Sequence, residues 1–236
     1  MRQINKSLAL LAAVVSSSAF ASPVTPTFSQ FGTLSAATFG GSGMDNTSVA
    51  MTTVSQANKL GNLTLGSTTA VMGLTISERY GVPAVSDNGA GVFTALAGAY
   101  APGDNLARWN FNYYVSNTKS GALAPNLTYK LFADFDSALG NDLSTYVDVS
   151  AYLLGSITFS GLNFVTQDSE NLGFGTSFAQ FDPNQIGQYG FALVAYSSGN
   201  EIGHSSILVN VVPEPTSLLL AGVALLGLAG TRRRRS

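Results

Sequence analysis

Alternation of apolar and polar residues at period two is the feature that most restricts the folds open to this chain. It is clearest in residues 107–116, ARWNFNYYVS, whose apolar set is Trp109, Phe111, Tyr113 and Val115. Because successive side chains of a β-strand point to opposite faces, this spacing predicts a strand with one buried face.

Similar patterns recur along the chain and predict further strands. The candidate segments are 47–54, 70–77, 91–97, 127–135, 145–152, 156–160, 189–197 and 206–212. Clusters of Asp, Asn, Gly and Pro between them mark turns. We find no convincing amphipathic helix between residues 22 and 212. The pattern therefore predicts an all-β fold, an antiparallel, jelly-roll-like β-sandwich.

The strand pattern is unevenly distributed. Residues 22–45 are rich in Ser, Thr and Gly, and we expect them to be looser than the rest. Residues 107–212 are denser in aromatic side chains and in clear alternation than the preceding part. A two-lobed arrangement is therefore an alternative to a single domain.

The N-terminus has the order of an export signal. A positively charged start is followed by an apolar stretch and a small-x-small site. This order predicts that residues 1–21 are a secretory signal peptide, with Ala19 and Ala21 at the cleavage site and Ser22 as the first mature residue. We expect the mature chain outside the cytoplasm, with residues 22–212 as its ectodomain.

The C-terminal segment, residues 213–236, combines three ordered elements. Two prolines bracket Glu214, residues 217–230 are apolar or small, and four arginines follow. Because a proline fixes its own φ and favours an extended predecessor, Val212 and Glu214 should lie outside any helix. As a helix the apolar run would be about 21 Å long, which is short for a hydrocarbon core of about 30 Å.

The arginines set the expected orientation of this segment. Arginine clusters favour the cytoplasmic side of a membrane, and snorkelling side chains and local thinning make a short span feasible. We therefore expect a single hydrophobic helix with the body outside. The residues expected inside are Arg232, Arg233, Arg234 and Arg235.

The tail resembles the PEP-CTERM sorting signal of Gram-negative bacteria that make exopolysaccharide. The matching elements are Val212-Pro213-Glu214-Pro215, the short apolar run and the terminal arginines. The resemblance implies recognition by exosortase, a membrane protease-transpeptidase thought to remove the tail and release or transfer the ectodomain. A plain single-span anchor is the alternative, although such an anchor is nearer to about 20 apolar residues. The resemblance covers only the tail and assigns no activity to the ectodomain.

Composition narrows the chemistry of the ectodomain. The chain has no cysteine, which excludes disulfides, cysteine nucleophiles, thiolate zinc sites and iron–sulfur clusters. Between residues 22 and 212 five basic residues stand against twelve carboxylates, a net charge of −7. Nucleic acid is therefore an unfavourable partner, whereas a hydrated matrix or divalent cations are compatible with such a surface.

One acidic loop is a candidate metal site. Segment 134–142 carries Asp134, Asp136 and Asp142 after a predicted strand, and carboxylate oxygens are calcium ligands. The spacing does not match an EF-hand, because Ala138 and Thr145 occupy positions where ligands are needed. A solvated turn without a metal is the alternative, and we expect no other cofactor.

Catalytic constellations are weak in this sequence. His204 is the only histidine, and its neighbour Ser205 lacks the context of a nucleophile elbow. Twelve carboxylates contain some pair at glycosidase spacing by chance, so that signal carries little weight. Segments 168–174 and 181–184 are interpreted as loops with aromatic residues packed beneath them. We therefore expect no enzyme activity.

A set of aromatic residues offers a binding alternative. Trp109, Tyr113, Tyr114 and Tyr129 could form a platform against sugar rings, although such residues are more often the core of a sandwich. Tyr114 is the exception to consider, because it falls on the polar face of its strand. The main expectation is an exported surface or matrix protein with a structural or adhesive role beside exopolysaccharide in a biofilm. A carbohydrate-binding module is the alternative, and a polysaccharide-acting hydrolase is third.

Overall fold

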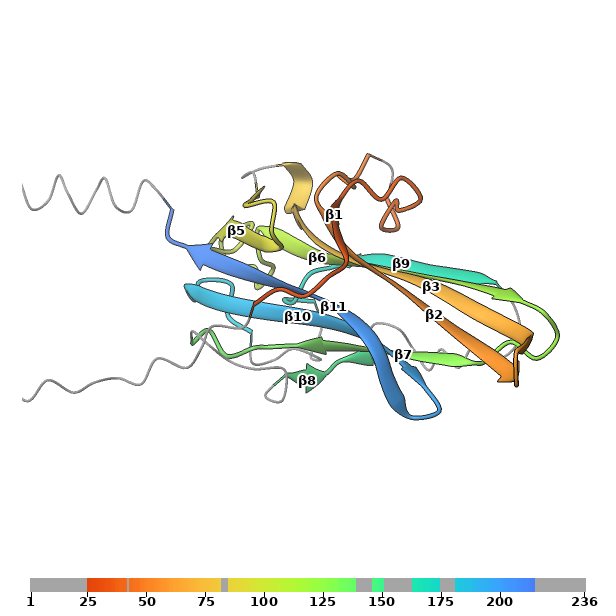
Figure 1. Cartoon of the computed structure of the whole chain (residues 1–236). Coiled ribbons are helices and arrows are strands. Elements are labelled where there is room, and N and C mark those ends of the chain that lie inside the picture. The colour runs from red at the N-terminus through yellow and green to blue at the C-terminus, as the bar shows by residue number, and fades with distance from the viewer. Residues whose placement is uncertain are drawn as a thin grey trace, which may run out of the picture.

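The computed structural model describes residues 25–41, 43–81, 85–138, 146–150, 163–174 and 181–214. Two β-sheets pack face to face, and the named elements are strands apart from one turn of 3-10 helix, Arg79–Gly81 (Figure 1). The all-β prediction is therefore confirmed for the described residues. The predicted signal peptide, the strand at 156–160 and the helix of the tail lie outside them.

The first sheet has the order β1-β2-β3-β6-β9 and is antiparallel throughout. Its strands are β1 (Gln30–Gly32), β2 (Val49–Leu60), β3 (Leu63–Glu78), β6 (Trp109–Ser120) and β9 (Phe164–Glu170). The turn of the long β2–β3 hairpin contains Gly61 at φ +59°, a left-handed conformation that glycine adopts without steric cost. This hairpin extends away from the end of the molecule where the last strand stops (Figure 1).

The second sheet has the order β4-β5-β11-β10-β7-β8. Its strands are β4 (Ser86–Asp87), β5 (Val92–Leu96), β7 (Leu127–Ala133), β8 (Val147–Asp148), β10 (Gly187–Ser197) and β11 (Asn200–Val212). The pair β5–β11 is parallel, so the prediction of an antiparallel sandwich is wrong at this pair. A parallel pair needs a long connection, and the chain from β6 to β10 supplies it.

Aromatic side chains dominate the core between the sheets. Phe111 of β6 stacks on Phe191 of β10, with ring centroids 4.6 Å apart and planes 13° from parallel. Trp109 meets Phe181 and Phe191 edge-on. All four apolar residues of the alternating segment 107–116 are buried. Alternation therefore identified the inward face of β6 correctly.

Strand boundaries differ from the sequence prediction where polar residues fill a strand. The hairpin strands β2 and β3 are longer than the predicted 47–54 and 70–77. The edge strand β9, with the sequence FVTQDSE, has no clear apolar face, and its last three residues were assigned to a loop. An edge strand needs only one partner, so backbone pairing with β6 holds it without alternation.

The segment between β1 and β2 covers part of the outer face of the first sheet. Phe39 is fully buried in a cluster with Ala37, Val49 and Tyr114. The Gln167 side-chain oxygen of β9 accepts hydrogen bonds from the backbone N–H of Thr38 (2.8 Å) and of Phe39 (2.9 Å). These contacts fix a segment whose composition suggested a looser one.

Candidate functional site

The last strand leads directly into the motif residues of the tail. Val212 of β11 lies opposite Leu96, and its carbonyl oxygen accepts a hydrogen bond from the Ala97 N–H at 2.8 Å. Pro213 follows and has no N–H to continue the ladder. Val212 therefore ends a strand, and Glu214 lies outside any regular element. Pro215 and the four arginines lie outside the described residues.

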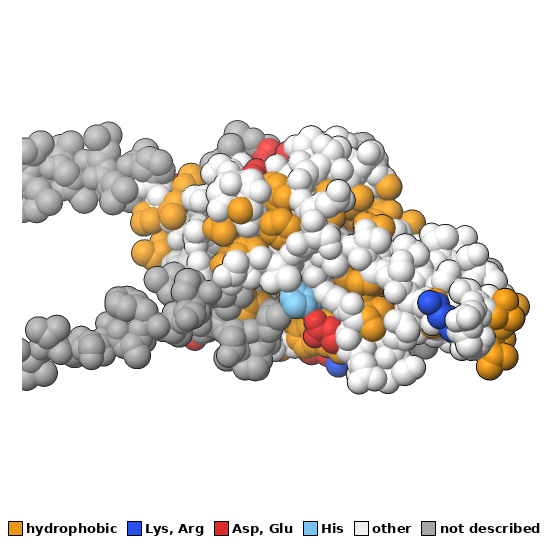
Figure 2. Space-filling model, viewed as in Figure 1, with side chains coloured by type: hydrophobic (Ala, Val, Ile, Leu, Met, Phe, Trp, Pro, Cys, Tyr) orange, Lys and Arg blue, Asp and Glu red, His pale blue; other side chains and the backbone are white. Residues whose placement is uncertain are grey.

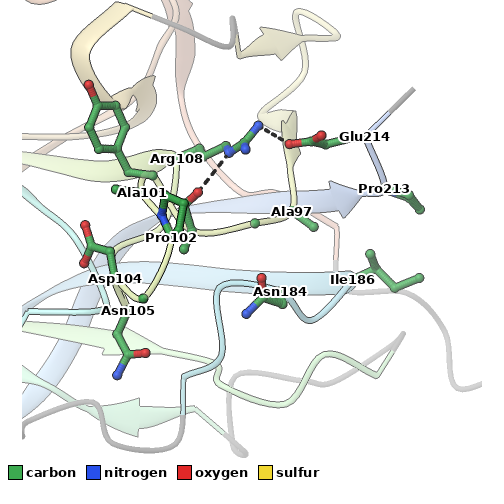
Figure 3. Close-up of a pocket in the computed structure, with 14 residues that line it drawn as sticks. Ala97, Ala101, Pro102, Asp104, Asn105, Arg108, Asn184, Ile186, Pro213 and Glu214 are labelled. Carbon is green, nitrogen blue, oxygen red and sulfur yellow. Dashed lines mark hydrogen bonds and ion pairs between the residues drawn. The ribbon is translucent and has the colours of Figure 1, made fainter. Parts of the chain in front are cut away.

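Glu214 turns back onto the folded body. Its carboxylate forms an ion pair with Arg108, the residue before β6, as Figure 3 shows. The Arg108 Nε also donates to the Ala99 carbonyl oxygen at 3.2 Å, which fixes the guanidinium on the body side. The two side chains are 29% and 33% exposed, so the pair contributes at most about 1 kcal/mol. It orients the glutamate without locking it in place.

The ion pair borders an open pocket of about 690 Å³. Its walls are the connection 97–105, Asn184 and Ile186 before β10, and Pro213 with Glu214 (Figure 3). Glycine suits position 98, because its φ of +115° is a conformation that residues with a Cβ rarely adopt. The described lining residues include no serine, histidine or lysine. Its described titratable lining residues are Tyr100, Asp104, Arg108 and Glu214.

His204 and Ser205 do not form a catalytic pair. Both lie in β11, and neighbouring residues of a strand point to opposite faces. The Ser205 hydroxyl is buried and donates to the Ala50 carbonyl oxygen at 2.8 Å. The His204 Nδ1 lies 2.6 Å from the Glu201 carboxylate at the surface, where Figure 2 shows the imidazole beside an acidic side chain.

The acidic loop after β7 bonds to its own backbone. An Asp134 carboxylate oxygen accepts the N–H of Asp136 at 2.9 Å, and Asp136 accepts the N–H of Ala138 at 3.0 Å. Such local turns are the alternative to a metal site. Asp142 lies outside the described residues, and among those that are described no group of three potential metal ligands occurs.

Three of the four candidate platform residues are buried in the core, which is the interpretation that the sequence favours for them. Trp109, Tyr113 and Tyr114 are each at most 3% exposed. Tyr129 is half-buried, and its hydroxyl donates to Asn117 at 3.0 Å. Tyr114 does lie on the outer face of β6, as predicted, but the segment with Phe39 covers it. Trp109, Tyr113 and Tyr114 therefore pack inside the protein and cannot stack on a sugar.

A different aromatic group, which we call the surface cluster, was missed. It comprises Arg79, Tyr80, Tyr100 and Phe174, and the Arg79 guanidinium lies 4.8, 5.9 and 4.9 Å from the three ring centroids in that order. The rings are 70%, 45% and 51% exposed. All three follow strands or lie in connections, where no sheet face buries them. That location is the sequence signal that could have identified them.

Carboxylates at the end of β9 affect a core tyrosine. Burial raises the pKa of Tyr113 to about 12, with a further contribution from the charges of Asp168 and Glu170. Burial also raises the pKa of Glu170, and the nearby Asp168 adds to this effect. Asp168 and Glu170 therefore shift pKa values near the end of β9. Both lie in the same edge strand, so they do not face each other across a cleft as the two carboxylates of a glycosidase do.

Comparison with known proteins assigns the tail. Residues 211–235 match the protein-family model described as the PEP-CTERM protein-sorting motif. The expected resemblance is thereby confirmed, and it indicates an extracellular protein sorted by exosortase, a membrane enzyme. No curated protein and no solved structure matches the chain. Within the described ranges, no helix is both long and apolar enough to span a membrane.

Proposed function

We propose that this exosortase-sorted chain is a non-enzymatic protein of the cell surface or extracellular matrix, with a structural or adhesive role beside exopolysaccharide. The observation that carries the proposal is the sorting motif, which begins where β11 of a folded all-β body ends. The net charge of −7 between residues 22 and 212 suits a hydrated matrix.

Export and processing follow a defined order in this proposal. The export machinery carries the chain across the inner membrane and the signal peptide is removed. The apolar run anchors the chain transiently, with the arginines inside. An exosortase-type enzyme then cuts near the Pro213-Glu214-Pro215 motif and frees the body from the membrane.

The intact mass of the protein from native cells tests this order. We expect a mass that starts at Ser22 and ends near the motif, both in the wild type and in Arg108→Ala. The Arg108 variant removes the weak ion pair with Glu214 and one hydrogen bond to the Ala99 carbonyl oxygen but leaves the motif intact, so it should not prevent processing. Glu214→Ala should retain the arginine tail and accumulate in the membrane.

Glu201→Ala is the matched control, because it also removes one exposed carboxylate but lies outside the motif. A Glu214→Ala protein with the same mass and location as the wild type would contradict the sorting step. The matrix role is tested separately in a strain that lacks the protein. Unchanged composition and cohesion of its matrix would contradict a structural or adhesive role.

A further inference from the structure

Arg79 is a buried cation whose charge the described residues leave incompletely compensated. The residue is only 7% exposed, and the Nε of its side chain has no hydrogen-bond partner among the described residues. Among the described residues no carboxylate forms an ion pair with it. Its hydrogen bond from Nη2 to the Tyr80 hydroxyl is long, at 3.3 Å. The Nε is itself shielded from solvent, so a ligand reaches only the terminal nitrogens of the guanidinium. Because burying a charge with few polar partners is unfavourable, acceptors supplied to those terminal nitrogens would stabilise it.

Arg79 lines a pocket of about 520 Å³ on the outer face of the first sheet. Register places Ser77, Asn110 and Ser169 on the same face, and all three line the pocket. The Asn110 amide donates to the Ser169 hydroxyl at 3.0 Å and accepts from the Asn171 amide at 2.8 Å. The polar floor is thus held in place before any ligand arrives.

Two rings of the surface cluster, those of Tyr80 and Phe174, border this polar floor. Tyr80 has φ 58° and ψ 30°, a left-handed conformation that is uncommon for a tyrosine. In this conformation its ring is 70% exposed and meets Tyr100 edge-on at 4.9 Å. The Phe174 ring centroid lies 4.9 Å from the guanidinium carbon, and Phe174 also lines the pocket. Exposed, clustered rings of this kind are typical of recognition surfaces.

The charges of the pocket select among possible ligands. Asp45, Glu78 and Asp168 line it together with Arg79, which gives a net charge of −2. An anionic glycan, a phosphate or a nucleic acid would be repelled. A neutral sugar has hydroxyls that donate to carboxylates and accept from amide and guanidinium groups, and its ring has apolar C–H faces. The mixture of donors, acceptors and rings therefore matches a neutral sugar.

We infer that the surface cluster and the adjoining pocket bind a hexose unit of a neutral polysaccharide. The sugar ring lies against Tyr80 and Phe174, and its hydroxyls bond to Arg79, Asn110 and the carboxylates. This site gives the adhesive role proposed above a ligand class and rests on that proposal for its biological setting. The binding itself does not depend on processing of the tail.

Direct binding measurements test the site. The full chain, purified in a detergent without a sugar headgroup, is titrated with neutral hexamers of glucose, galactose and mannose and with a hexamer of galacturonic acid. We expect at least one neutral hexamer to bind and the acidic hexamer to bind at least about tenfold more weakly. Tyr80→Asn and Phe174→Ala should each weaken binding about three- to tenfold.

The variants are chosen so that a loss of binding is distinguishable from unfolding. Asparagine tolerates the left-handed conformation of position 80, and Phe174 is half exposed, so both variants should keep the wild-type melting temperature. Leu63→Ala, at the tip of the β2–β3 hairpin, removes an apolar side chain of 62% exposure far from the cluster. This control should bind as the wild type does.

Three results would overturn the inference. They are no binding of any neutral hexamer, preferential binding of the acidic hexamer, and unchanged affinity in folded Tyr80→Asn and Phe174→Ala proteins. A change in oligomeric state or vesicle binding in these variants, without glycan affinity, would assign the cluster to a protein or lipid surface instead. In cells, Tyr80→Asn should leave the processed mass unchanged while matrix cohesion falls, which separates this site from the sorting step.

Discussion

Two groups of aromatic residues in this protein have opposite surroundings. The core group, with Trp109, Phe111 and Phe191, lies on inward strand positions between the sheets. The surface cluster lies after strands and in connections, around a buried arginine. Both groups consist of aromatic residues, so residue type does not distinguish buried rings from exposed ones. The position of a residue along its strand, and whether another segment covers it, make that distinction.

Tyr114 shows why the covering segment matters. It occupies an outward position of β6, which would make it a recognition residue by alternation alone. The segment that contains Ala37 and Phe39 lies over it, and its exposure falls to 3%. It therefore belongs with the core group in its energetics, although it faces away from the core.

Phe191→Ala should give the largest effect on stability. It removes the ring that stacks on Phe111 and contacts Trp109, and it leaves a cavity between the sheets. We expect a loss of about 3 to 5 kcal/mol in the free energy of unfolding, measured by urea denaturation. A loss under about 1 kcal/mol would mean that the core collapses around the gap, and the contrast with the surface cluster would weaken.

Tyr114→Ala should rank second, with a loss of about 2 to 4 kcal/mol in the same measurement. Its ring is buried against a single covering segment rather than between two sheets, so the site has more freedom to relax. Glycan affinity of the folded fraction should not change. A stable variant with reduced glycan affinity would instead return Tyr114 to the recognition group.

Tyr80→Asn should change stability by no more than about 0.5 kcal/mol, because surface side chains contribute little and asparagine accepts the left-handed backbone. Thermal unfolding monitored by circular dichroism measures this. A loss comparable to that of Tyr114→Ala would show that the surface cluster is a packing feature, and it would remove the distinction drawn between the two groups.

Glu170→Gln should give the smallest change in the free energy of unfolding, and this change should depend on pH. Its folded pKa is raised by burial and by Asp168, so the ionised form is disfavoured in the folded state. The stabilising contribution of the protonated form is therefore present below the unfolded pKa of about 4.3 and lost as pH rises through the folded pKa. The variant should be slightly more stable than the wild type at pH 7 and equal to it at low pH.

Asp148→Asn is the control of opposite sign for this titration. Partial burial raises the pKa of Asp148, but hydrogen bonds from Ser150 and Lys130 outweigh it, and the net pKa is lowered. Its contribution is present above the unfolded pKa and lost as pH falls. The variant should therefore be less stable than the wild type at pH 7. Urea denaturation midpoints of Glu170→Gln, Asp148→Asn and the wild type are compared across pH 3 to 8. If both variants shift the midpoint at pH 7 in the same direction, the opposite pKa shifts of the two carboxyl groups are contradicted.

Local sequence patterns predicted the strands with apolar faces and the sorting motif. They could not predict the partner of β5, because a parallel pair depends on two segments more than a hundred residues apart in the chain. They also missed β9, whose FVTQDSE sequence depends on backbone pairing rather than on alternation. The exposure of the cluster's rings was open to prediction from their positions after strands and in connections. Their gathering around Arg79 was not, since Arg79, Tyr100 and Phe174 meet only after both sheets form.

The position of β11 sets how far the body can stand from the membrane in the proposed pathway. β11 is an interior strand of its sheet, held by β5 and β10, and it stays paired to Val212. Only residues 213–216 separate it from the apolar run, and four residues span at most about 14 Å even when fully extended. If the apolar run inserts as proposed, this short connection confines the cut to the gap between the end of β11 and the lipid headgroups.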